Sequence, residues 1–299
     1  MIYGKGGALR TNPSPLRYPG GKTKLAGFIR LAIQNLNIQD CTYVEPFAGG
    51  AGVALSLLLD NVVERIVIND YDKSIYSFWR AIKQEPNDLI ARIKNTPITI
   101  EEWYRQKAIY SSSTSYSLDF AFATLFLNRT NRSGILNAGP IGGYAQAGEW
   151  KIDVRFNKDA IISKIEAIAK VRNRIIVYNK DIISLLHNYV PSLDGNLFFY
   201  FDPPYFNKGQ ELYKNYFTPS DHKKIYDVIS QEITAPWIAT YDDVTSIKEV
   251  YSNYDIRMFD LMYSAANKGV ASEIMIFSDV KFCPSKKQLL DNGIKINLR

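Results

Sequence analysis

The chain has 299 residues, is 46% hydrophobic and carries a formal net charge of +6, which allows one large domain or two modest ones and suits a polyanionic partner. Two distant cysteines, Cys41 and Cys283, and only two histidines argue against a disulfide scaffold, a His-based metal site and a His-based catalytic triad. No stretch approaches the roughly 20 apolar residues of a membrane span, and residues 1–19 lack a signal-peptide core, so we expect a cytoplasmic protein.

Strands and helices alternate in the first segment, residues 1–72. Thr42–Glu45 and Arg65–Ile68 are short apolar runs that predict buried strands. Between them, Ala51–Leu59 predicts a helix rich in Ala, Leu and Val. Strands that alternate with helices indicate a mainly parallel sheet wrapped by helices, an α/β fold.

The second segment, residues 73–157, has no strand run of this kind. A polar, glycine-rich loop from Asn128 to Gly148 ends its helical part, and basic residues in and after the loop outnumber acidic ones. A helical block between two α/β segments indicates an inserted domain. The predicted helices are Ile75–Ile82, Leu89–Ile93, Glu101–Tyr110 and Leu118–Leu127.

The α/β alternation resumes in residues 158–299. Only a short linker joins the last two predicted strands, whereas a parallel crossover needs a dozen or more residues. The last strand should therefore run antiparallel to its neighbour, at the edge of the sheet. The basic tail after Asp279 is expected to be a solvated end. The predicted elements are helix Lys158–Val171, strands Ile175–Tyr178 and Leu197–Phe201, helix Pro219–Ile233, strand Trp237–Thr240, helix Val244–Tyr251, and strands Ile256–Met262 and Glu273–Phe277.

A glycine-rich turn joins the first predicted strand to the next helix. It reads Glu45-Pro46-Phe47-Ala48-Gly49-Gly50-Ala51-Gly52. Glycine lets a backbone approach a ligand closely, and such a turn is where an open parallel sheet binds adenosine-containing ligands. Asp70 ends the next strand, where a carboxylate can accept hydrogen bonds from ribose hydroxyls. The alternatives are a tight structural turn and an ordinary surface Asp.

A second motif, Phe201-Asp202-Pro203-Pro204-Tyr205, follows a fully apolar strand. Two prolines fix a rigid turn and remove two N–H donors, so nearby carbonyls are left to accept bonds from another group. With the Asp carboxylate as a further acceptor and the Tyr ring as a flat surface, the motif suits an exocyclic amino group. The alternative is a proline-rich turn with a capping Asp.

A third motif, Leu16-Arg17-Tyr18-Pro19-Gly20-Gly21-Lys22, places basic residues beside a glycine pair. Backbone N–H groups and positive charge could hold a carboxylate or a phosphate there. A flexible N-terminal loop is the competing interpretation.

In order along the chain, these motifs resemble the Dam family of N6-adenine DNA methyltransferases, in the class whose recognition domain is inserted between cofactor and catalytic motifs. The resemblance covers about Ser14 to Ser278. The family often has Trp or Phe-like aromatics at the Tyr18 position and Gly-Ala-Gly within the glycine-rich turn. The matching positions are Tyr18-Pro19-Gly20-Gly21-Lys22, Glu45-Pro46-Phe47-Ala48-Gly49-Gly50, Asn69-Asp70, Asn128-Arg129, Ser133-Gly134, Asp202-Pro203-Pro204-Tyr205, Tyr241-Asp242-Asp243 and Tyr263-Ser264-Ala265.

The resemblance implies a Rossmann-like S-adenosylmethionine-dependent fold. Residues 1–72 and 158–299 would form the catalytic domain, and 73–157 a helical target-recognition domain. Catalysis would fall to Asp202, the Pro203 carbonyl, Pro204 and Tyr205, with Tyr205 stacked on the target base. The cofactor would be held by Tyr18 and Lys22 at its methionine end, by Glu45, Pro46, Phe47, Gly49 and Gly50 at the turn, by Asp70 at the ribose and by Asp181 at the adenine amine.

DNA contacts are expected in and beside the loop from Asn128 to Gly148, because this loop lies between the two catalytic segments and is polar and basic. Arg132 is predicted to recognise one base pair and Lys158 to contact phosphate. An alternative is that Arg129 and Arg132 only fasten the loop to the protein. The predicted DNA-binding residues are Arg129, Asn131, Arg132, Ser133, Lys151 and Arg155.

The expected reaction is methyl transfer to the N6 of an adenine flipped out of double-stranded DNA, without a metal. Expected partners are that DNA and a cognate restriction endonuclease, for a bacterial or phage-encoded chain that is a monomer or weak dimer. The alternatives are an N4-cytosine DNA or RNA base methyltransferase, a nicotinamide-dependent oxidoreductase and a catalytically inactive DNA-binding module. No proton donor accompanies the glycine-rich turn, which disfavours the oxidoreductase, and the intact Asp202–Tyr205 motif disfavours the inactive module.

Overall fold

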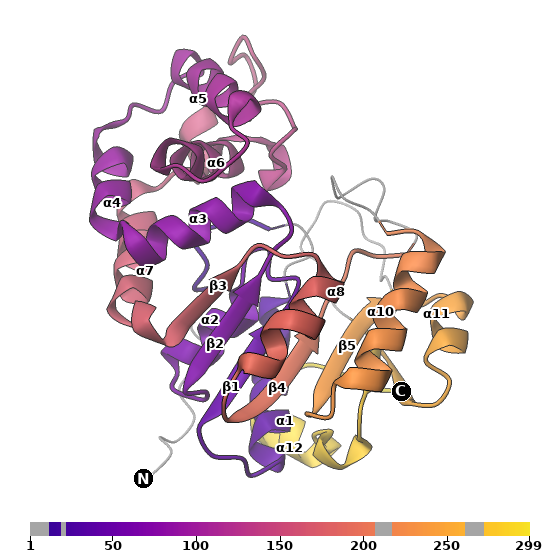
Figure 1. Cartoon of the computed structure of the whole chain (residues 1–299). Helices are drawn as coiled ribbons and strands as arrows, with labels where there is room; N and C mark the ends of the chain where they lie inside the picture. Colours follow the sequence, from indigo (N-terminus) through magenta and orange to yellow (C-terminus); the bar gives the residue numbers. More distant parts are fainter. Residues whose placement is uncertain (1–11, 19–21, 207–216, 261–271) are drawn as a thin grey trace.

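A seven-stranded sheet forms the centre of the molecule in the computed structural model, which describes residues 12–18, 22–206, 217–260 and 272–299 (Figure 1). Its strand order is β3-β2-β1-β4-β5-β7-β6. Strands β1, β2, β4, β5 and β7 are largely buried, as their apolar sequences require, whereas β3 and β6 are mostly half-buried. They are β1 (Cys41–Glu45), β2 (Arg65–Asn69), β3 (Ile175–Tyr178), β4 (Asn196–Phe201), β5 (Trp237–Asp242), β6 (Asp255–Asp260) and β7 (Ser272–Phe277).

Six strands of the sheet run in the same direction, and the last strand along the chain, β7, runs opposite to them. Strands β3, β2, β1, β4 and β5 pair in parallel, while β7 is antiparallel to both β5 and β6. The expected α/β fold with a mainly parallel sheet and an antiparallel last strand is confirmed. The expectation that this strand lies at the edge was wrong. Strand β7 inserts between β5 and β6, so both its sides are paired and β6 becomes the outer strand.

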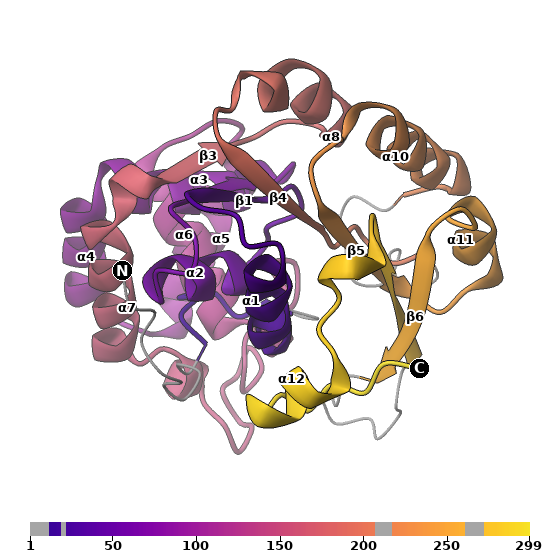
Figure 2. The same ribbon diagram turned by 90° about the horizontal axis from the view of Figure 1, so that it is seen from below.

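Helices cover both faces of the sheet (Figure 2). Helix α2 consists almost entirely of apolar residues, and it is buried from Val53 to Leu58 because it lies between the sheet and neighbouring helices. The face of α2 also carries α1 and the C-terminal α12, whereas α8, α10 and α11 pack on the opposite face. These helices are α1 (Ala26–Asn35), α2 (Gly52–Leu59), α8 (Ile182–Ser184), α10 (Pro219–Glu232), α11 (Thr245–Val250) and α12 (Lys286–Asp291).

A helical block stands above the sheet at its β2–β3 side (Figure 1). The α6 sequence is apolar around its whole circumference, and the helix is buried continuously from Phe120 to Asn128 at the centre of the block. Side chains cap four of the helices: Asp72, Thr99, Ser117 and Asn157 each accept a bond from a first-turn backbone N–H. The helices are α3 (Lys73–Gln84), α4 (Pro86–Asn95), α5 (Ile100–Ser112), α6 (Leu118–Thr130) and α7 (Lys158–Lys170).

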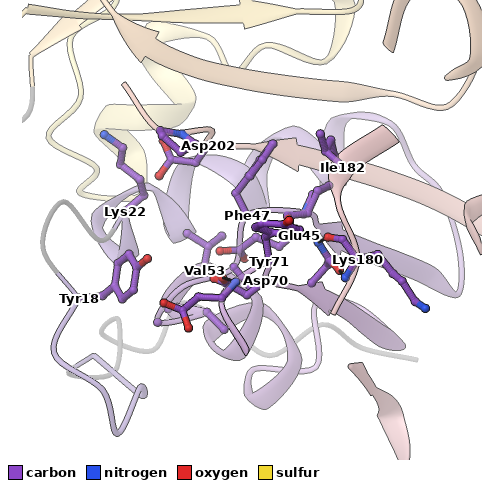
Figure 3. A pocket seen from close by; sticks show the side chains of 18 of the residues that line it. Tyr18, Lys22, Glu45, Phe47, Val53, Asp70, Tyr71, Lys180, Ile182 and Asp202 are labelled. Carbon is purple, nitrogen blue, oxygen red and sulfur yellow. Dashed lines mark hydrogen bonds between the residues drawn. The ribbon is translucent and has the colours of Figure 1, made fainter. Parts of the chain in front are cut away.

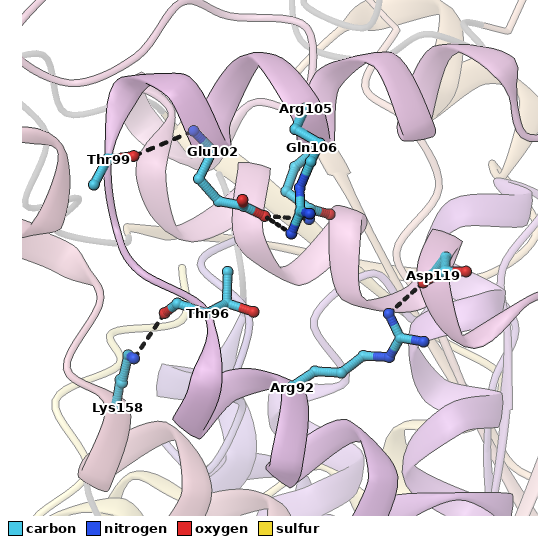
Figure 4. A network of polar contacts seen from close by, with 8 residues as sticks. All are labelled: Arg92, Thr96, Thr99, Glu102, Arg105, Gln106, Asp119 and Lys158. Carbon is cyan, nitrogen blue, oxygen red and sulfur yellow. Dashed lines mark hydrogen bonds and ion pairs between the residues drawn. The ribbon is translucent and has the colours of Figure 1, made fainter.

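Polar contacts fasten the helices of this block to one another (Figure 4). Arg92 of α4 forms an ion pair with Asp119 of α6. Lys158 donates hydrogen bonds to the carbonyls of Lys94 (2.8 Å) and Thr96 (2.7 Å) at the end of α4. The Lys158 ammonium thus caps a helix C-terminus, and its contact with phosphate stays a prediction. One continuous core runs from the sheet into the block, and the assignment of residues 73–157 to target recognition stays a prediction.

The C-terminal tail packs against the body of the protein instead of forming a solvated end. Leu289, Ile294 and Ile296 are at most 8% exposed. Gln288 exchanges hydrogen bonds with Asn35 of α1. The expectation of a solvated end rested on the tail's basic residues, but the apolar residues between them are buried and determine its position.

Candidate functional site

A pocket of about 640 Å³ opens at the carboxyl ends of β1, β2 and β4, where parallel strands of an open sheet place their ligands (Figure 3). Lys22 and Asp202 lie together at one end, and Ile182 and Lys180 at the other. Its lining includes the predicted residues Tyr18, Lys22, Glu45, Pro46, Phe47, Gly50, Asp70, Asp181, Asp202 and Pro204, joined by Asn12, Ser14, Leu16, Tyr71, Asp72, Ile182, Ile183 and Phe217, which were not predicted.

A buried carboxylate closes the turn after β1. Glu45, only 5% exposed, accepts a hydrogen bond from the backbone N–H of Ala54 (3.0 Å) in the first turn of α2. Burial raises the pKa of the Glu45 carboxyl to about 8. Ala51 has φ of +47°, so the chain turns back sharply and α2 begins at Gly52, one residue later than expected.

Asp70, at the end of β2, binds the backbone of this turn. Its Oδ2 accepts from the N–H of Gly49 (2.8 Å) and its Oδ1 from the N–H of Asp72 (2.9 Å). Burial raises the pKa of Asp70 to about 7, with a further contribution from Asp72. The carboxylate therefore fixes the glycine-rich turn to the neighbouring strand while it lines the pocket.

The glycines of the turn make room for the Tyr18 ring. Gly49 has φ of +45°, and a Cβ there would lie 2.6 Å from the Tyr18 ring. At Gly50 a Cβ would lie 3.0 Å from the Cβ of Tyr18. Gly49 therefore requires glycine, and Gly50 leaves little room for a side chain, because Tyr18 packs against both.

Neighbouring loops are joined at the other end of the pocket. The buried Asn69 amide donates to the carbonyls of Pro46 (2.9 Å) and Lys180 (3.0 Å) and accepts from the Lys180 N–H (2.9 Å). Asp181 is exposed and accepts from the Ser184 N–H (2.9 Å), so it caps α8 at the rim. Phe47 packs edge-on against Phe217. An apolar slot with acceptors at its rim results.

The Asp202 carboxylate is held by a chain of buried hydroxyls. Thr240 of β5 donates to Asp202 Oδ1 (2.7 Å), and the Tyr200 hydroxyl lies 2.8 Å from the Thr240 Oγ1. Burial raises the pKa of Asp202 to about 6, while Lys22 and the Thr240 hydrogen bond act to lower it. The carboxylate is thus oriented from behind, on the side away from the pocket.

Three side chains distant in sequence meet beside Asp202. The Lys22 ammonium binds Glu273 Oε2 (2.6 Å) and the Tyr205 hydroxyl, and lies 4.8 Å from the centroid of the Tyr205 ring. The Tyr205 hydroxyl donates to Glu273 Oε1 (2.8 Å). Pro203 is buried between the two groups of contacts. The structure thus brings the second and third motifs together, and adds Glu273 to them.

Sequence reasoning missed Thr240 and Glu273, although each breaks a pattern. Thr240 is the polar residue in an apolar strand, and Glu273 is a carboxylate directly before the apolar run Ile274–Phe277. Both are fully buried, at 0% and 1% exposure. A buried polar residue inside a strand was the available signal.

Asn131 does not present its side chain to a ligand. It is 0% exposed, accepts from the Trp103 indole N–H (2.6 Å) and donates to the carbonyls of Ile135 and Leu136 (3.0 Å each). The prediction of a DNA contact by Asn131 is therefore wrong in this conformation. Its amide fixes the loop to α5.

The other predicted DNA-binding residues lie nearer the surface. Arg132, Ser133, Lys151 and Arg155 are exposed, whereas Arg129 is half-buried. A Cβ at Gly139 would lie 3.1 Å from the Arg132 guanidinium and 3.3 Å from the Tyr144 hydroxyl, so both side chains extend over that glycine. Two motif segments, Pro19-Gly20-Gly21 and Tyr263-Ser264-Ala265, lie outside the described residues.

The pocket suits an adenosine-containing cofactor. Its volume lies within the usual range for such sites, about 300–1,000 Å³. Apolar walls formed by Phe47, Val53 and Ile182 can hold a flat base, and the Asp70 and Asp181 carboxylates can accept from hydroxyls and an amine. Among the described residues, no group of three or more His, Cys, Asp or Glu side chains could hold a metal, and no helix is long and apolar enough to cross a membrane.

Known proteins resemble this chain in sequence and in fold. Residues 18–266 match the family model of the D12 class N6 adenine-specific DNA methyltransferases. The type II methyltransferase M.MjaIII of Methanocaldococcus jannaschii is 22% identical over 278 residues, which span 87% of this chain and 91% of that protein. The rRNA methyltransferase aviRa from Streptomyces viridochromogenes aligns with a TM-score of 0.40 and 13% identity over 90% of this chain and 88% of its own. The methyltransferase domain of bacterial CtHen1-CN aligns with a TM-score of 0.36 and 10% identity over 86% and 98%.

Proposed function

We propose that this chain, which belongs to the D12 class of N6 adenine-specific DNA methyltransferases, uses S-adenosylmethionine and takes the amino group of an extrahelical adenine at Asp202. The observation that carries the proposal is the placement of Asp202 at the end of β4, held from behind by Thr240 and facing the pocket that the glycine-rich turn encloses. An acceptor fixed in this way can orient an amine without reorganising during the reaction.

Asp202 and the Pro203 carbonyl are assigned to the amino group. The lone pair of that nitrogen is delocalised into the adenine ring, which makes it a poor nucleophile. Accepting its hydrogens favours a more tetrahedral nitrogen, whose lone pair is then available for in-line attack. Thr240 occupies one oxygen of Asp202, and the other is assigned to the amine. Because a protonated carboxyl accepts poorly, Asp202 must be ionised.

The predicted cofactor-binding residues are assigned to S-adenosylmethionine, and Tyr205 is assigned to the target base. S-adenosylmethionine, when bound, supplies an electrophilic methyl group on sulfur. Tyr18 and Lys22 would hold its methionine end, Phe47 and the Gly49 turn its centre, and Asp70 its ribose. Asp181, at the rim, would accept from the adenine amine. With this order, the methyl group on the cofactor's sulfur would lie beside Asp202.

A cluster of cations supports a duplex-DNA substrate. The cluster consists of Arg17, Arg129, Arg155 and Lys164. Burial lowers the pKa of three of them, Arg17, Arg129 and Lys164, and the positive charge of neighbouring members lowers it further. Within the described part of the chain no carboxylate forms an ion pair with these four, and the buried Arg129 Nε has no hydrogen-bond partner.

Phosphate groups of DNA would neutralise this cluster. The cluster's members come from the N-terminal segment, α6, α7 and the turn before α7, which supports contacts with the DNA backbone on this side of the protein. Base recognition is assigned to the exposed Arg132 and Ser133 of the inserted domain. The type II designation of the archaeal relative supports a restriction-modification setting.

Incubation with duplex DNA and S-adenosylmethionine labelled on its methyl group tests the proposal. Digestion to nucleosides should yield label in N6-methyladenine, and calorimetry should detect binding of S-adenosylmethionine but of no nicotinamide cofactor. Label in N4-methylcytosine, or transfer to RNA alone, would replace the proposal with the corresponding alternative.

A further inference from the structure

The Glu273 carboxylate has two partners that the proposed reaction assigns to different ligands. Its Oε1 accepts from the hydroxyl of Tyr205, the residue assigned to the target base, at 2.8 Å. Its Oε2 binds the ammonium of Lys22, the residue assigned to the cofactor, at 2.6 Å. The Glu273 and Lys22 side chains are each 2% exposed, so water does not compete for these bonds.

This arrangement depends on the complete fold. Glu273 stands 251 residues from Lys22 and 68 from Tyr205, and it reaches both because β7 inserts next to β5. Burying an ion pair is costly unless its geometry is good and other hydrogen bonds complete it. The Tyr205 hydroxyl provides such a bond to each member of the pair. The three groups therefore form one unit in which each fixes the other two.

We propose that Glu273 is a positioning residue for methyl transfer, which sets the Tyr205 ring and the Lys22 ammonium in one geometry and so aligns the target base with the cofactor. The proposal rests on the proposed function of the same site. A hydroxyl held by Glu273 fixes the ring plane on which a base would stack. Misplacing reactants by about 1 Å can cost roughly 100-fold in rate.

Glu273 also balances charge beside Asp202. Lys22 and Glu273 together are neutral, so Asp202 keeps the net negative charge that attracts an amine. Lys22 lowers the pKa of Asp202, and Glu273 raises it. Without the Glu273 charge, the pKa of Asp202 should fall. Among the described residues, Lys22 and Glu273 are the titratable groups that shift the pKa of Asp202. Asp202 in turn raises the pKa of Tyr43, Glu45, Tyr200 and Tyr241.

Glu273→Gln tests the proposal, with Glu232→Gln as the matched control. Glu232 pairs with His187 on the surface, away from the pocket. In Glu273→Gln, kcat should fall roughly 10- to 100-fold and the acidic limb of its pH profile should move to lower pH. Glu232→Gln should keep both. A merely structural role for Glu273 would lower the amount of active enzyme without moving the limb.

Tyr205→Phe keeps the ring and removes its bond to Glu273, so it also carries the test if Glu273→Gln does not fold. Its kcat should fall in the same way, and the double variant should lose less than the product of the two single losses. Normal kcat in folded Glu273→Gln or, if that variant does not fold, in Tyr205→Phe would overturn the positioning role while wild-type methylation still stands. Absence of adenine methylation in the wild type would instead overturn the proposed function.

Discussion

Two parts of the pocket are built in different ways: the glycine-rich end, which is the turn Glu45–Gly52 with Asp70, and the Asp202 end, which includes Lys22, Tyr205, Thr240 and Glu273. At the glycine-rich end, carboxylates bind backbone N–H groups over short sequence separations: Glu45 reaches Ala54 nine residues on, and Asp70 reaches Gly49 twenty-one residues back. At the Asp202 end, side chains bind side chains across 38 to 251 residues. Substitutions at the first end should therefore alter local shape and cofactor affinity, and those at the second end should alter turnover.

Asp202→Ala should have the largest effect on turnover of all the variants. Turnover should fall at least 100- to 1,000-fold, since the placed acceptor for the amine is lost. The dissociation constant for S-adenosylmethionine should stay within about twofold, because Asp202 is assigned to the base. Single-turnover kinetics and calorimetry measure the two quantities. A large loss of cofactor affinity would show that the two ends are not separable.

Thr240→Val should lower turnover by roughly 10- to 160-fold, since a hydrogen bond to a charged group contributes about 1.5–3 kcal/mol. The Thr240 bond lowers the pKa of Asp202, which is about 6. Its loss should raise that pKa, so activity should disappear at a higher pH as the solution is acidified. Thr240→Ser keeps the donor and should retain the wild-type pH profile. An unmoved acidic limb in Thr240→Val would mean that Asp202 does not set it.

Gly49→Ala should act on the cofactor end. Its Cβ would lie 2.6 Å from the Tyr18 ring, on a residue with φ of +45°. Gly293, with φ of +65° and no atom within 4 Å of a built Cβ, is the matched control for backbone strain. Both variants should lose about 1–2 kcal/mol of stability. Only Gly49→Ala should also bind S-adenosylmethionine about tenfold more weakly, and equal affinities in the two variants would show that the Tyr18 contact does not shape the site.

Arg132→Ala and Arg155→Ala should have the smallest effects, outside both ends. Arg132→Ala should relax preference at one base pair by about 1 kcal/mol, roughly fivefold. Arg155→Ala should weaken all duplexes equally and reduce the salt slope by about 0.9. Methylation rates on single-substitution duplexes at several salt concentrations separate the two. A uniform loss for Arg132→Ala would reassign it to phosphate or to folding of the loop.

The same contrast explains what the sequence could predict. The turn at Glu45–Gly52 and the carboxylate of Asp70 were predictable because their partners lie one element away and glycine marks the turn. Thr240 and Glu273 were not, because their roles follow from strand order, which places β5 beside β4 and β7 beside β5. Asn131 misled because its partner, the Trp103 indole, comes from another helix.

The C-terminal residues cover the free edge of β6, the outer strand of the sheet. Strand β6 has a second side that β7 does not cover, and unpaired strand edges invite pairing with other chains. Arg299 exchanges two backbone hydrogen bonds with Met258 (2.9 Å each), and Leu298 bridges Phe259. Removing residues 294–299 would uncover this edge together with the apolar contacts of Ile294 and Ile296. Such a shortened protein should aggregate at concentrations where the full chain stays dispersed, even if its pocket is intact.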